Sequence, residues 1–539
     1  MKMTVSQAMV ECLKAENVKV VFGYPGAAIC PFYDALLDAE NDIRQVLVRQ
    51  EANGGHAANG YARISGKPAV CIATSGPGAT NLITAIATAY ADSIPIVCIT
   101  GQVNTDQIGS DVFQEADITG SAEPFVKHSY LLKDPEDTAR VFKEAFYIAG
   151  TGRPGPVLID IPMDVQKAVI DFEYPEKCEI RSYKPTTKGN YVQVRRVMAA
   201  LEEAEKPLIC IGGGVFAAHA ENEIRELADL MQIPVITTMM GISVFPDDDQ
   251  LFCGMIGTHG VKMANAAVNE CDVLFLVGAR VGDRAVKTPL ALEKTTKIIH
   301  IDIDPAEIGK NIGADLPLVG DAKLVLQQMT ELAKPMKHDE WIAHIKTLGG
   351  ERKYVEPATV NPRVFIDRLA KKMPANVTVV ADVGQNQIWT CTEYKFRKEG
   401  RLLTSGGMGT MGYSVPAAIG AKMADNSRAT VAICGDGAFQ MSFMELATAV
   451  QFGVDIKVVV MTNNRLGMVR ELQTNGYHDR QTAVFLDGSP DFIKLAEAYG
   501  IPAMRVYDDD TMDKGIEMLA EHKGICLVEV VVDKDMPTL

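Results

Sequence analysis

Residues 430–437 read Thr-Val-Ala-Ile-Cys-Gly-Asp-Gly, and a second apolar run, 456–461, leads into the pair Asn463-Asn464. Each motif therefore follows a short apolar run that ends in turn residues, the pattern of a buried parallel strand. Open α/β sheets bind their ligands at the carboxyl ends of such strands. A hard divalent cation such as Mg²⁺ prefers oxygen ligands shared between carboxylates and phosphates. Asp436 and the side-chain carbonyl of Asn464 offer two such oxygens, so the stretch predicts a metal and phosphate site, with two ordinary turns as the alternative.

Strand-like runs alternate with helical patterns along the whole chain, the arrangement that builds parallel α/β sheets. A polar stretch around Tyr174-Pro175 and Lys184-Pro185 and a charged stretch over 337–362 are expected to be linkers. We therefore expect an α/β protein with three doubly wound parallel-sheet domains, covering residues 1–172, 186–336 and 360–539. The expected strands are 18–22, 69–73, 94–100, 157–161, 208–211, 273–277, 297–303, 377–381, 430–434, 456–461 and 527–532.

Composition narrows the classes of partner. The 539 residues carry a formal net charge of −16, which argues against nucleic acid and anionic membranes as partners. No apolar stretch reaches membrane-spanning length, and the first residues lead into an amphipathic helix rather than a signal sequence. The 11 Cys are scattered singly, several inside apolar runs, as in proteins of a reducing compartment. We expect a cytoplasmic protein.

A carboxylate near the N-terminus lies in a similar context. Glu51 follows the strand-like run 45–48 and precedes the small-residue helical stretch 52–62, so it is expected at a strand end that faces a cleft. An isolated Glu is usually a solvated charge, and its interpretation depends on the motifs around it.

Taken together, the motifs resemble acetohydroxyacid (acetolactate) synthase catalytic subunits, a family of thiamine diphosphate (ThDP) enzymes, over essentially the whole chain. Gly-Asp-Gly followed by Asn-Asn resembles the diphosphate-and-metal motif of ThDP enzymes. The segments that resemble the family's pyrimidine-binding domain are 23–26, 49–51, 60–63, 74–81 and 111–115. Those that resemble its diphosphate-binding domain are 384–386, 405–413, 435–438 and 463–469.

The resemblance implies a role for each matched residue. Glu51 would hydrogen-bond the pyrimidine ring and set its tautomer, while Gly26, Phe113 and Gln114 would lie at the catalytic and pyruvate-binding site. The metal ligands would be Asp436, Asn464 and the backbone carbonyl of Leu466. Met411 would hold the cofactor bent, and further ThDP contacts would come from Thr74, Gly384, Gln385, Asn386, Gly409, Gly435, Ala438, Gly467 and Met468.

The middle segment resembles the family's FAD-binding domain. Its Gly-rich turns follow apolar runs, and backbone amides in such turns can hold a pyrophosphate. Some relatives keep this domain without flavin, so a flavin-free domain is the alternative. The implied FAD contacts are Arg153, Gly212, Gly213, Thr238, His259, Gly278, Arg280, Arg284, Asp302 and Asp321.

The implied reaction is decarboxylation of pyruvate on ThDP with Mg²⁺, followed by condensation of the hydroxyethyl group with a second 2-oxo acid, as in branched-chain amino acid biosynthesis. Another ThDP-dependent 2-oxo acid lyase or oxidase, or a non-catalytic ThDP-binding paralogue, are the alternatives. The resemblance also implies a homodimer or homotetramer with sites between chains, and it leaves room for a small regulatory subunit.

Four departures from the family pattern lie near the expected substrate entrance. Met163 replaces a Lys, Leu472 replaces a Trp, and the segment 463–468 is one residue shorter than usual, which bears on Leu466 as a metal ligand. The sequence also stops at Leu539, without the longer tail common in the family.

Overall fold

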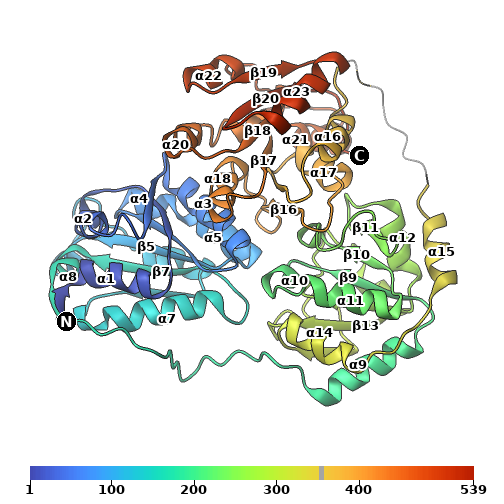
Figure 1. Ribbon diagram of the computed structural model, residues 1–539, viewed down its shortest axis with the longest axis horizontal. Coiled ribbons are helices and arrows are strands. Elements are labelled where there is room, and N and C mark those ends of the chain that lie inside the picture. The colour runs from blue at the N-terminus through green and yellow to red at the C-terminus, as the bar shows by residue number, and fades with distance from the viewer. Residues whose placement is uncertain (351–356, 358) are drawn as a thin grey trace.

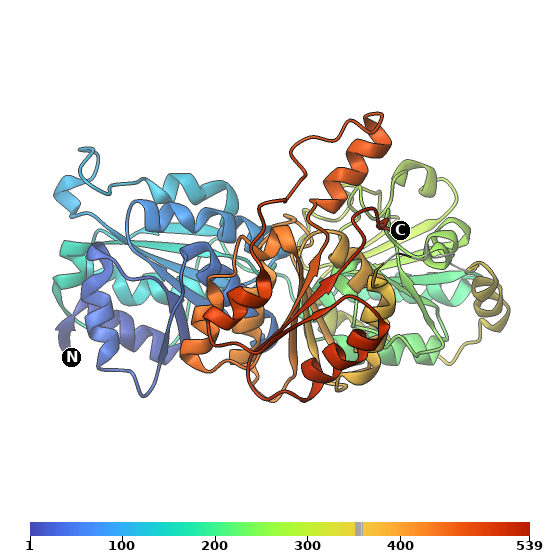
Figure 2. The same cartoon turned by 90° about the horizontal axis from the view of Figure 1, so that it is seen from above.

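The computed structural model describes residues 1–350, 357 and 359–539. Its described residues form three six-stranded sheets, each purely parallel, with helices on both faces (Figure 1). In the view from above, the C-terminal domain lies between the N-terminal and middle domains (Figure 2). The expected fold class of three doubly wound parallel-sheet domains is confirmed.

The N-terminal sheet has the strand order β3-β2-β4-β5-β7-β6. A short antiparallel pair, β1 with β8, ties the chain start to the end of this domain. The strands are β1 (Lys2–Thr4), β2 (Val20–Gly23), β3 (Arg44–Leu47), β4 (Ala69–Ala73), β5 (Ile96–Gln102), β6 (His128–Leu131), β7 (Val157–Pro162) and β8 (Val169–Asp171). The α-helices are α1 (Val5–Ala15), α2 (Cys30–Leu37), α3 (Glu51–Ser65), α4 (Pro77–Asn81), α5 (Ile83–Asp92), α6 (Ile118–Ala122), α7 (Thr138–Gly150) and α8 (Met163–Lys167).

The middle sheet has the order β11-β10-β9-β12-β13-β14, which is the dinucleotide-binding order 3-2-1-4-5-6 when its strands are numbered along the chain. Its strands are β9 (Pro207–Ile211), β10 (Val235–Thr237), β11 (Phe252–Met255), β12 (Val273–Val277), β13 (Lys297–Asp302) and β14 (Leu316–Val319). Its helices are α9 (Tyr191–Glu203), α10 (Gly214–Ala217), α11 (Glu221–Met231), α12 (Lys262–Glu270), α13 (Pro289–Leu292), α14 (Ala322–Thr330) and α15 (Asp339–Thr347).

The C-terminal sheet has the order β16-β15-β17-β18-β20-β19, which repeats the relative order of the N-terminal sheet. Its strands are β15 (Thr378–Ala381), β16 (Arg401–Thr404), β17 (Thr430–Gly435), β18 (Lys457–Thr462), β19 (Ala503–Val506) and β20 (Cys526–Val531). Its helices are α16 (Pro362–Lys372), α17 (Gln385–Glu393), α18 (Ser414–Ala424), α19 (Asp436–Phe439), α20 (Glu445–Phe452), α21 (Gly467–Gly476), α22 (Phe492–Ala498) and α23 (Asp509–Glu521).

Every strand expected from the sequence is present, with ends that differ by at most two residues. No regular element lies between β8 and α9, in the stretch expected to be the first linker, and Tyr174, Ile180 and Tyr183 of that stretch pack against the core of the N-terminal domain. The second expected linker is wrong in its first half. Helix α15 lies there because Trp341 and Ile345 are buried in the core of the middle domain, and Trp341 Nε1 donates to Pro207 O at 3.0 Å. Residues 351–356 and 358 of that stretch lie outside the described part of the chain.

Two helices join the N-terminal and C-terminal domains. Helix α3 packs against α18 with the backbones in direct contact, because a Cβ added at Gly60 would collide with Ala417 O and one at Gly420 with Ala57 O. Tyr413 OH adds a buried hydrogen bond of 2.8 Å to Asn59 Oδ1.

Within the described residues, no helix is long and apolar enough to cross a membrane.

Candidate active site

Glu51 is the first residue of α3, and its neighbours form a cluster on the N-terminal domain. Its Oε2 accepts from Asn81 Nδ2 at 2.9 Å, and a Cβ on Gly78 would lie 3.3 Å from its Oε1. Gly26 packs so closely on Thr74 that a Cβ there would collide with the Thr side chain. Thr74 Oγ1 is buried without a hydrogen-bond partner in the described part of the chain. Gly26 and Thr74 follow β2 and β4, the two strands at which the strand order reverses, where such sheets bind ligands.

The segment that carries Phe113 and Gln114 borders this cluster. A Cβ on Gly76, at the start of α4, would lie 2.9 Å from Gln114 O, so the segment packs against the turn after β4. Phe113 is 88% exposed and points away from the core. Gln114 has a positive φ of 61°, a conformation that is uncommon for residues other than glycine. Phe113 therefore contributes little to the folded core and is available for a ligand.

Asp436 forms the centre of the cluster on the C-terminal domain. It is 2% exposed, and its Oδ2 accepts the backbone N–H groups of Asn463 at 3.1 Å and Asn464 at 2.6 Å. Burial raises the pKa of the Asp436 carboxyl to about 6. No ion pair to Asp436 exists in the described part of the chain, so a bound cation would offset the cost of burying its charge.

The two other predicted metal ligands lie in the next loop. Asn464 has a φ of 53°, and within the described residues its side chain makes no hydrogen bond, which leaves its carbonyl oxygen available. Leu466 O accepts from Arg470 N at 2.9 Å, but a carbonyl oxygen has a second lone pair. These donors match the oxygen ligands that Mg²⁺ prefers.

Glycines bring the predicted diphosphate loops together. A Cβ on Gly467, at the start of α21, would collide with Gln385 Oε1 at the start of α17. A Cβ on Gly435 would lie 3.4 Å from Asn386 Oδ1. The loops after β15, β17 and β18 therefore meet at the carboxyl edge of the sheet, again at the point where the strand order reverses.

The segment before α18 forms the remaining wall, which contains Gly409 and Met411. Gly409 has a φ of 70°, and the Met411 methyl would lie 3.5 Å from a Cβ on Gly437. Asp382, which we did not single out from the sequence, fixes this segment. Its two carboxylate oxygens accept from Gly412 N at 3.0 Å and Ser414 N at 2.8 Å. Asp382 directly follows the expected strand 377–381, but only its contacts with a segment about 30 residues away show what it does.

Gln385 is held by the chain end. Its Nε2 donates to Met536 O at 2.8 Å and to Thr538 Oγ1 at 3.2 Å, and its Oε1 accepts from Asn463 Nδ2 at 3.3 Å. The amide of Gln385 is therefore committed to protein contacts, so its part in cofactor binding remains a prediction.

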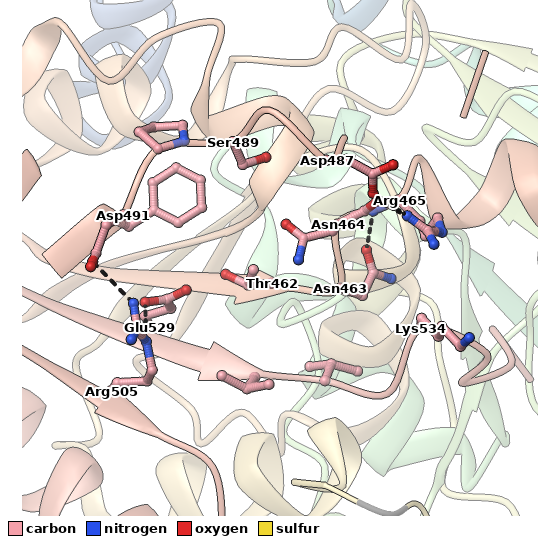
Figure 3. Close-up of a pocket in the computed structure, with 14 residues that line it drawn as sticks. Thr462, Asn463, Asn464, Arg465, Asp487, Ser489, Asp491, Arg505, Glu529 and Lys534 are labelled. Atoms are coloured by element: carbon pink, nitrogen blue, oxygen red, sulfur yellow. Dashed lines mark hydrogen bonds and ion pairs between the residues drawn. The ribbon is translucent and has the colours of Figure 1, made fainter. Parts of the chain in front are cut away.

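A cavity of about 640 Å³ lies beside the expected metal loop, at the carboxyl ends of β18 and β20. Figure 3 shows the Asn464 side chain in the space between Ser489 and Thr462. Thr462 Oγ1 has no hydrogen-bond partner within the described residues. Arg505 on the far wall is paired with Glu529 at 2.8 Å and with Asp491 at 3.0 Å, so its charge is balanced within the wall.

A larger cavity of about 1370 Å³ lies among the three domains. Gly212 lies behind the wall, where a Cβ on it would collide with Gly278 O. Arg153 crosses from the N-terminal domain to pair with Glu307 at 2.7 Å and Asp304 at 3.2 Å. Burial raises the pKa of the Asp302 carboxyl to about 6. The predicted FAD contacts that line this cavity are Arg153, Gly213, Thr238, His259, Gly278, Arg280, Arg284, Asp302 and Asp321.

The structure thus assembles the predicted residues into three groups, one at the switch point of each sheet. The large cavity is also lined by Gly409, Met468 and Leu472, so the group on the C-terminal domain borders the predicted FAD contacts. No hydrogen bond or ion pair among the described residues joins the Glu51 cluster to the Asp436 cluster.

Glu445 is a second residue that the sequence did not reveal. It begins α20 in the C-terminal domain, is 1% exposed, and accepts from the backbone N–H of Arg49 at 2.9 Å and from Asn53 Nδ2 at 3.0 Å. These two residues stand on either side of Glu51 in the chain, and a separation of almost 400 residues hides the contact from any local pattern.

Burial affects the histidines His56 and His259. His56 is buried and packs edge-on against Tyr413 with 5.5 Å between the ring centres. Burial lowers its pKa to about 4, so it is a neutral interface residue rather than part of an open cleft. Burial also lowers the pKa of His259, which lines the large cavity.

Comparisons with known proteins agree with this geometry. The family model of the thiamine pyrophosphate enzyme N-terminal TPP binding domain matches residues 3–121, that of the central domain matches 194–329, and that of the C-terminal TPP binding domain matches 382–530. Each match falls within a different one of the three domains.

Curated relatives match nearly the full chain. This chain is 44% identical over 543 residues to a probable acetolactate synthase large subunit of Methanocaldococcus jannaschii, and the match covers 98% of this chain and 92% of that protein. It is 43% identical to an acetolactate synthase large subunit of Corynebacterium glutamicum, covering 99% of this chain and 87% of that protein. An acetolactate synthase of Arthrospira platensis is 42% identical, covering 99% and 95%. The chain therefore belongs to the acetolactate synthase large-subunit family of thiamine pyrophosphate enzymes.

Proposed function

We propose that this chain is the catalytic subunit of an acetolactate synthase. It decarboxylates pyruvate and joins the remaining two-carbon unit to a second 2-oxo acid. The observation that carries the proposal is that one chain holds both halves of a ThDP site, Glu51 with Thr74 and Gly26 on one domain and Asp436 with Asn464 on another. When bound, ThDP supplies a nucleophilic carbon that adds to the keto group and stabilises the charge left by loss of CO₂.

Glu51 acts as the proton partner of the aminopyrimidine ring. Within the described residues its carboxylate has a single side-chain hydrogen bond, from Asn81, so the second oxygen remains available for a ring N–H. In that position the carboxylate would hold or release a proton at the aminopyrimidine ring of bound ThDP, which is general acid–base assistance. The unpaired Thr74 hydroxyl adds a donor or acceptor beside it.

Asp436, Asn464 and the carbonyl of Leu466 would hold Mg²⁺, and the metal would in turn hold the diphosphate. The donor set fits a hard cation, and the buried Asp436 carboxylate lacks any other positive partner in the described chain. Gly384, Asn386, Gly435, Ala438, Gly467 and Met468 would line the diphosphate and thiazolium side, with Met411 as the prop that bends the cofactor.

Gly26, Phe113 and Gln114 would form the pyruvate-binding wall. Phe113 offers an exposed apolar ring, and Gly26 keeps the space beside Thr74 free of a side chain. Apolar walls with few polar groups are typical of small-molecule sites.

FAD is our proposal for the large cavity. Its volume of about 1370 Å³ is above the ~300–1,000 Å³ of ordinary ligand pockets, and the turns after β9 and β12 line it with Gly213, Gly214 and Gly278, which have no side chain to obstruct a ligand. No flavin chemistry is required by the reaction, so we assign the flavin a structural role.

The active unit is proposed to be a homodimer or homotetramer. A two-fold axis that places the Glu51 cluster of one chain against the Asp436 cluster of the next yields two equal sites from one interface. The relatives from Methanocaldococcus jannaschii and Corynebacterium glutamicum are named large subunits, which supports a small regulatory partner here. Nine of the free cysteines are buried and none forms a disulfide within the described chain, which supports a cytoplasmic location.

Incubation of the purified protein with pyruvate, ThDP and Mg²⁺ tests the proposal, with products identified by mass and a spectrum taken for flavin. Acetolactate is the expected product. Acetyl phosphate or acetaldehyde as the main product would assign the chain to another ThDP reaction, and no turnover would leave a non-catalytic paralogue.

A further inference from the structure

Glu445 holds the turn that presents Glu51. Its Oε1 accepts from the backbone N–H of Arg49 at 2.9 Å and from Asn53 Nδ2 at 3.0 Å. Its Oε2 accepts from Thr448 Oγ1 at 2.6 Å. All three contacts are to groups that are themselves at least partly buried, so water does not compete for them.

The turn has few restraints of its own. Strand β3 ends at Leu47, and α3 begins at Glu51 after the cap residue Gln50, whose side chain accepts from Asn53 N at 3.1 Å. Gln is not among the preferred cap residues, and the Arg49 N–H has no other acceptor in the described chain. Removing Glu445 would leave that buried donor unpaired and free the turn to shift.

Glu445 belongs to the C-terminal domain, so its hydrogen bonds to Arg49 and Asn53 join two domains. It links the first residues of α20 to the exact segment that carries Glu51, while its carboxylate lies too deep to meet a ligand itself. Burial raises the pKa of Glu445, and the hydrogen bonds that it accepts oppose that rise. Charge-assisted hydrogen bonds of this kind are strong and directional.

We propose that Glu445 is a positioning residue for Glu51, which fixes the height and direction of that carboxylate in the ThDP site. The inference rests on the proposed function, because it assigns Glu445 an effect only through the catalytic carboxylate. Glu445 itself is not a catalytic residue.

A matched contact on the same helix provides the control. Gln451 Oε1 accepts from Arg49 Nη2 at 2.6 Å, so Gln451→Ala also removes a hydrogen bond between the two domains. It leaves in place the hydrogen bonds that Glu445 accepts from the Arg49 N–H and from Asn53. A general weakening of the domain interface would affect both variants, whereas loss of positioning would affect only Glu445→Ala.

The experiment measures kcat, the KM for pyruvate and the ThDP activation constant for Glu445→Ala, Glu445→Gln and Gln451→Ala. Because a misplacement of about 1 Å costs roughly 100-fold in rate, we expect kcat of Glu445→Ala to fall about 10- to 100-fold, with both constants nearly unchanged. Glu445→Gln should recover most of the rate, since an amide oxygen accepts from Arg49 and Asn53 and its NH₂ donates to Thr448. Gln451→Ala should resemble wild type.

The same substitution in a Glu51→Gln background is the decisive arm. If Glu445 acts through Glu51, Glu445→Ala should cost little further rate there, because the two effects are not additive. An equal loss in both backgrounds, or an unaltered kcat in Glu445→Ala, overturns the inference while wild-type acetolactate formation leaves the proposed function intact. If Glu445→Ala does not fold, Asn53→Ala releases the same carboxylate from the other side and is subject to the same test.

Discussion

At Glu51, one carboxylate oxygen is bound by Asn81 and the other faces space that Gly78 leaves open. Glu51→Gln preserves the shape and the hydrogen bond to Asn81 but cannot stabilise a charged pyrimidine tautomer. We expect ThDP to bind and turnover to fall by about two or more orders of magnitude. Steady-state assays with a ThDP titration check both parts, and near wild-type turnover would contradict the role of Glu51.

Leu472 is the residue at which acceptor choice is expected to differ from the related family. It is 66% exposed on α21 and lines the large cavity, in the place where the family pattern has a Trp. A methylene in an apolar pocket contributes about 1–3 kcal/mol to selectivity, and Leu offers less rigid contact than Trp. We expect pyruvate to be preferred as the acceptor. Leu472→Trp should raise the ratio of product made from 2-oxobutyrate to product made from pyruvate by roughly tenfold.

A competition assay with equal pyruvate and 2-oxobutyrate measures that ratio. The alternative is that Met468, which lines the same cavity, or Phe113 fills the space that Leu472 leaves. A wild-type protein that already favours 2-oxobutyrate, together with an indifferent Leu472→Trp variant, would show that one of them does so.

At the scale of elements, α3 and α18 meet through glycine. Gly420 allows the Ala57 carbonyl to approach the α18 backbone, and Gly60 does the same for Ala417. Gly420→Ala forces these helices apart, and overpacking of this kind costs about 1–3 kcal/mol or more. We expect a lower midpoint of thermal unfolding and weaker ThDP activation, since α3 begins with Glu51.

Gly476→Ala is the control for that substitution. No atom lies within 4 Å of a Cβ at Gly476, and Ala is the better helix former, so the midpoint should stay or rise. If the Gly420→Ala protein has the same unfolding midpoint as wild type, the close approach of α3 and α18 does not contribute to stability and the prediction is wrong.

At the scale of the whole molecule, the two halves of the site lie on domains that share one strand order, and among the described residues no hydrogen bond or ion pair joins the Glu51 cluster directly to the Asp436 cluster. A site shared between chains predicts complementation. Glu51→Gln and Asp436→Ala proteins, each inactive, should regain activity when their subunits exchange, because every mixed dimer holds one intact site. The measurement is acetolactate formation after mixing, with exchange followed by mass-labelled subunits. Confirmed exchange without activity would place each site within one chain.

The alternation of apolar runs and helical patterns was enough to predict three parallel sheets, because a strand buried on both faces needs a continuous apolar run. The turns after those runs located Glu51, Gly435, Asp436 and Asn464, since ligand sites of such sheets lie at the carboxyl ends of strands. Gly26 and Thr74 were found only through the family resemblance. The resemblance to a known family then supplied the roles.

Tertiary packing alone decided the rest. Helix α15 forms in a stretch that looks like a charged linker, because Trp341 and Ile345 find an apolar surface on the middle domain. His56 becomes neutral because Tyr413 covers it. Asp382 and Glu445 act on segments about 30 and almost 400 residues away, and local sequence holds no record of such pairs. Periodicity reports which face of an element is buried, and only the folded chain determines what buries it.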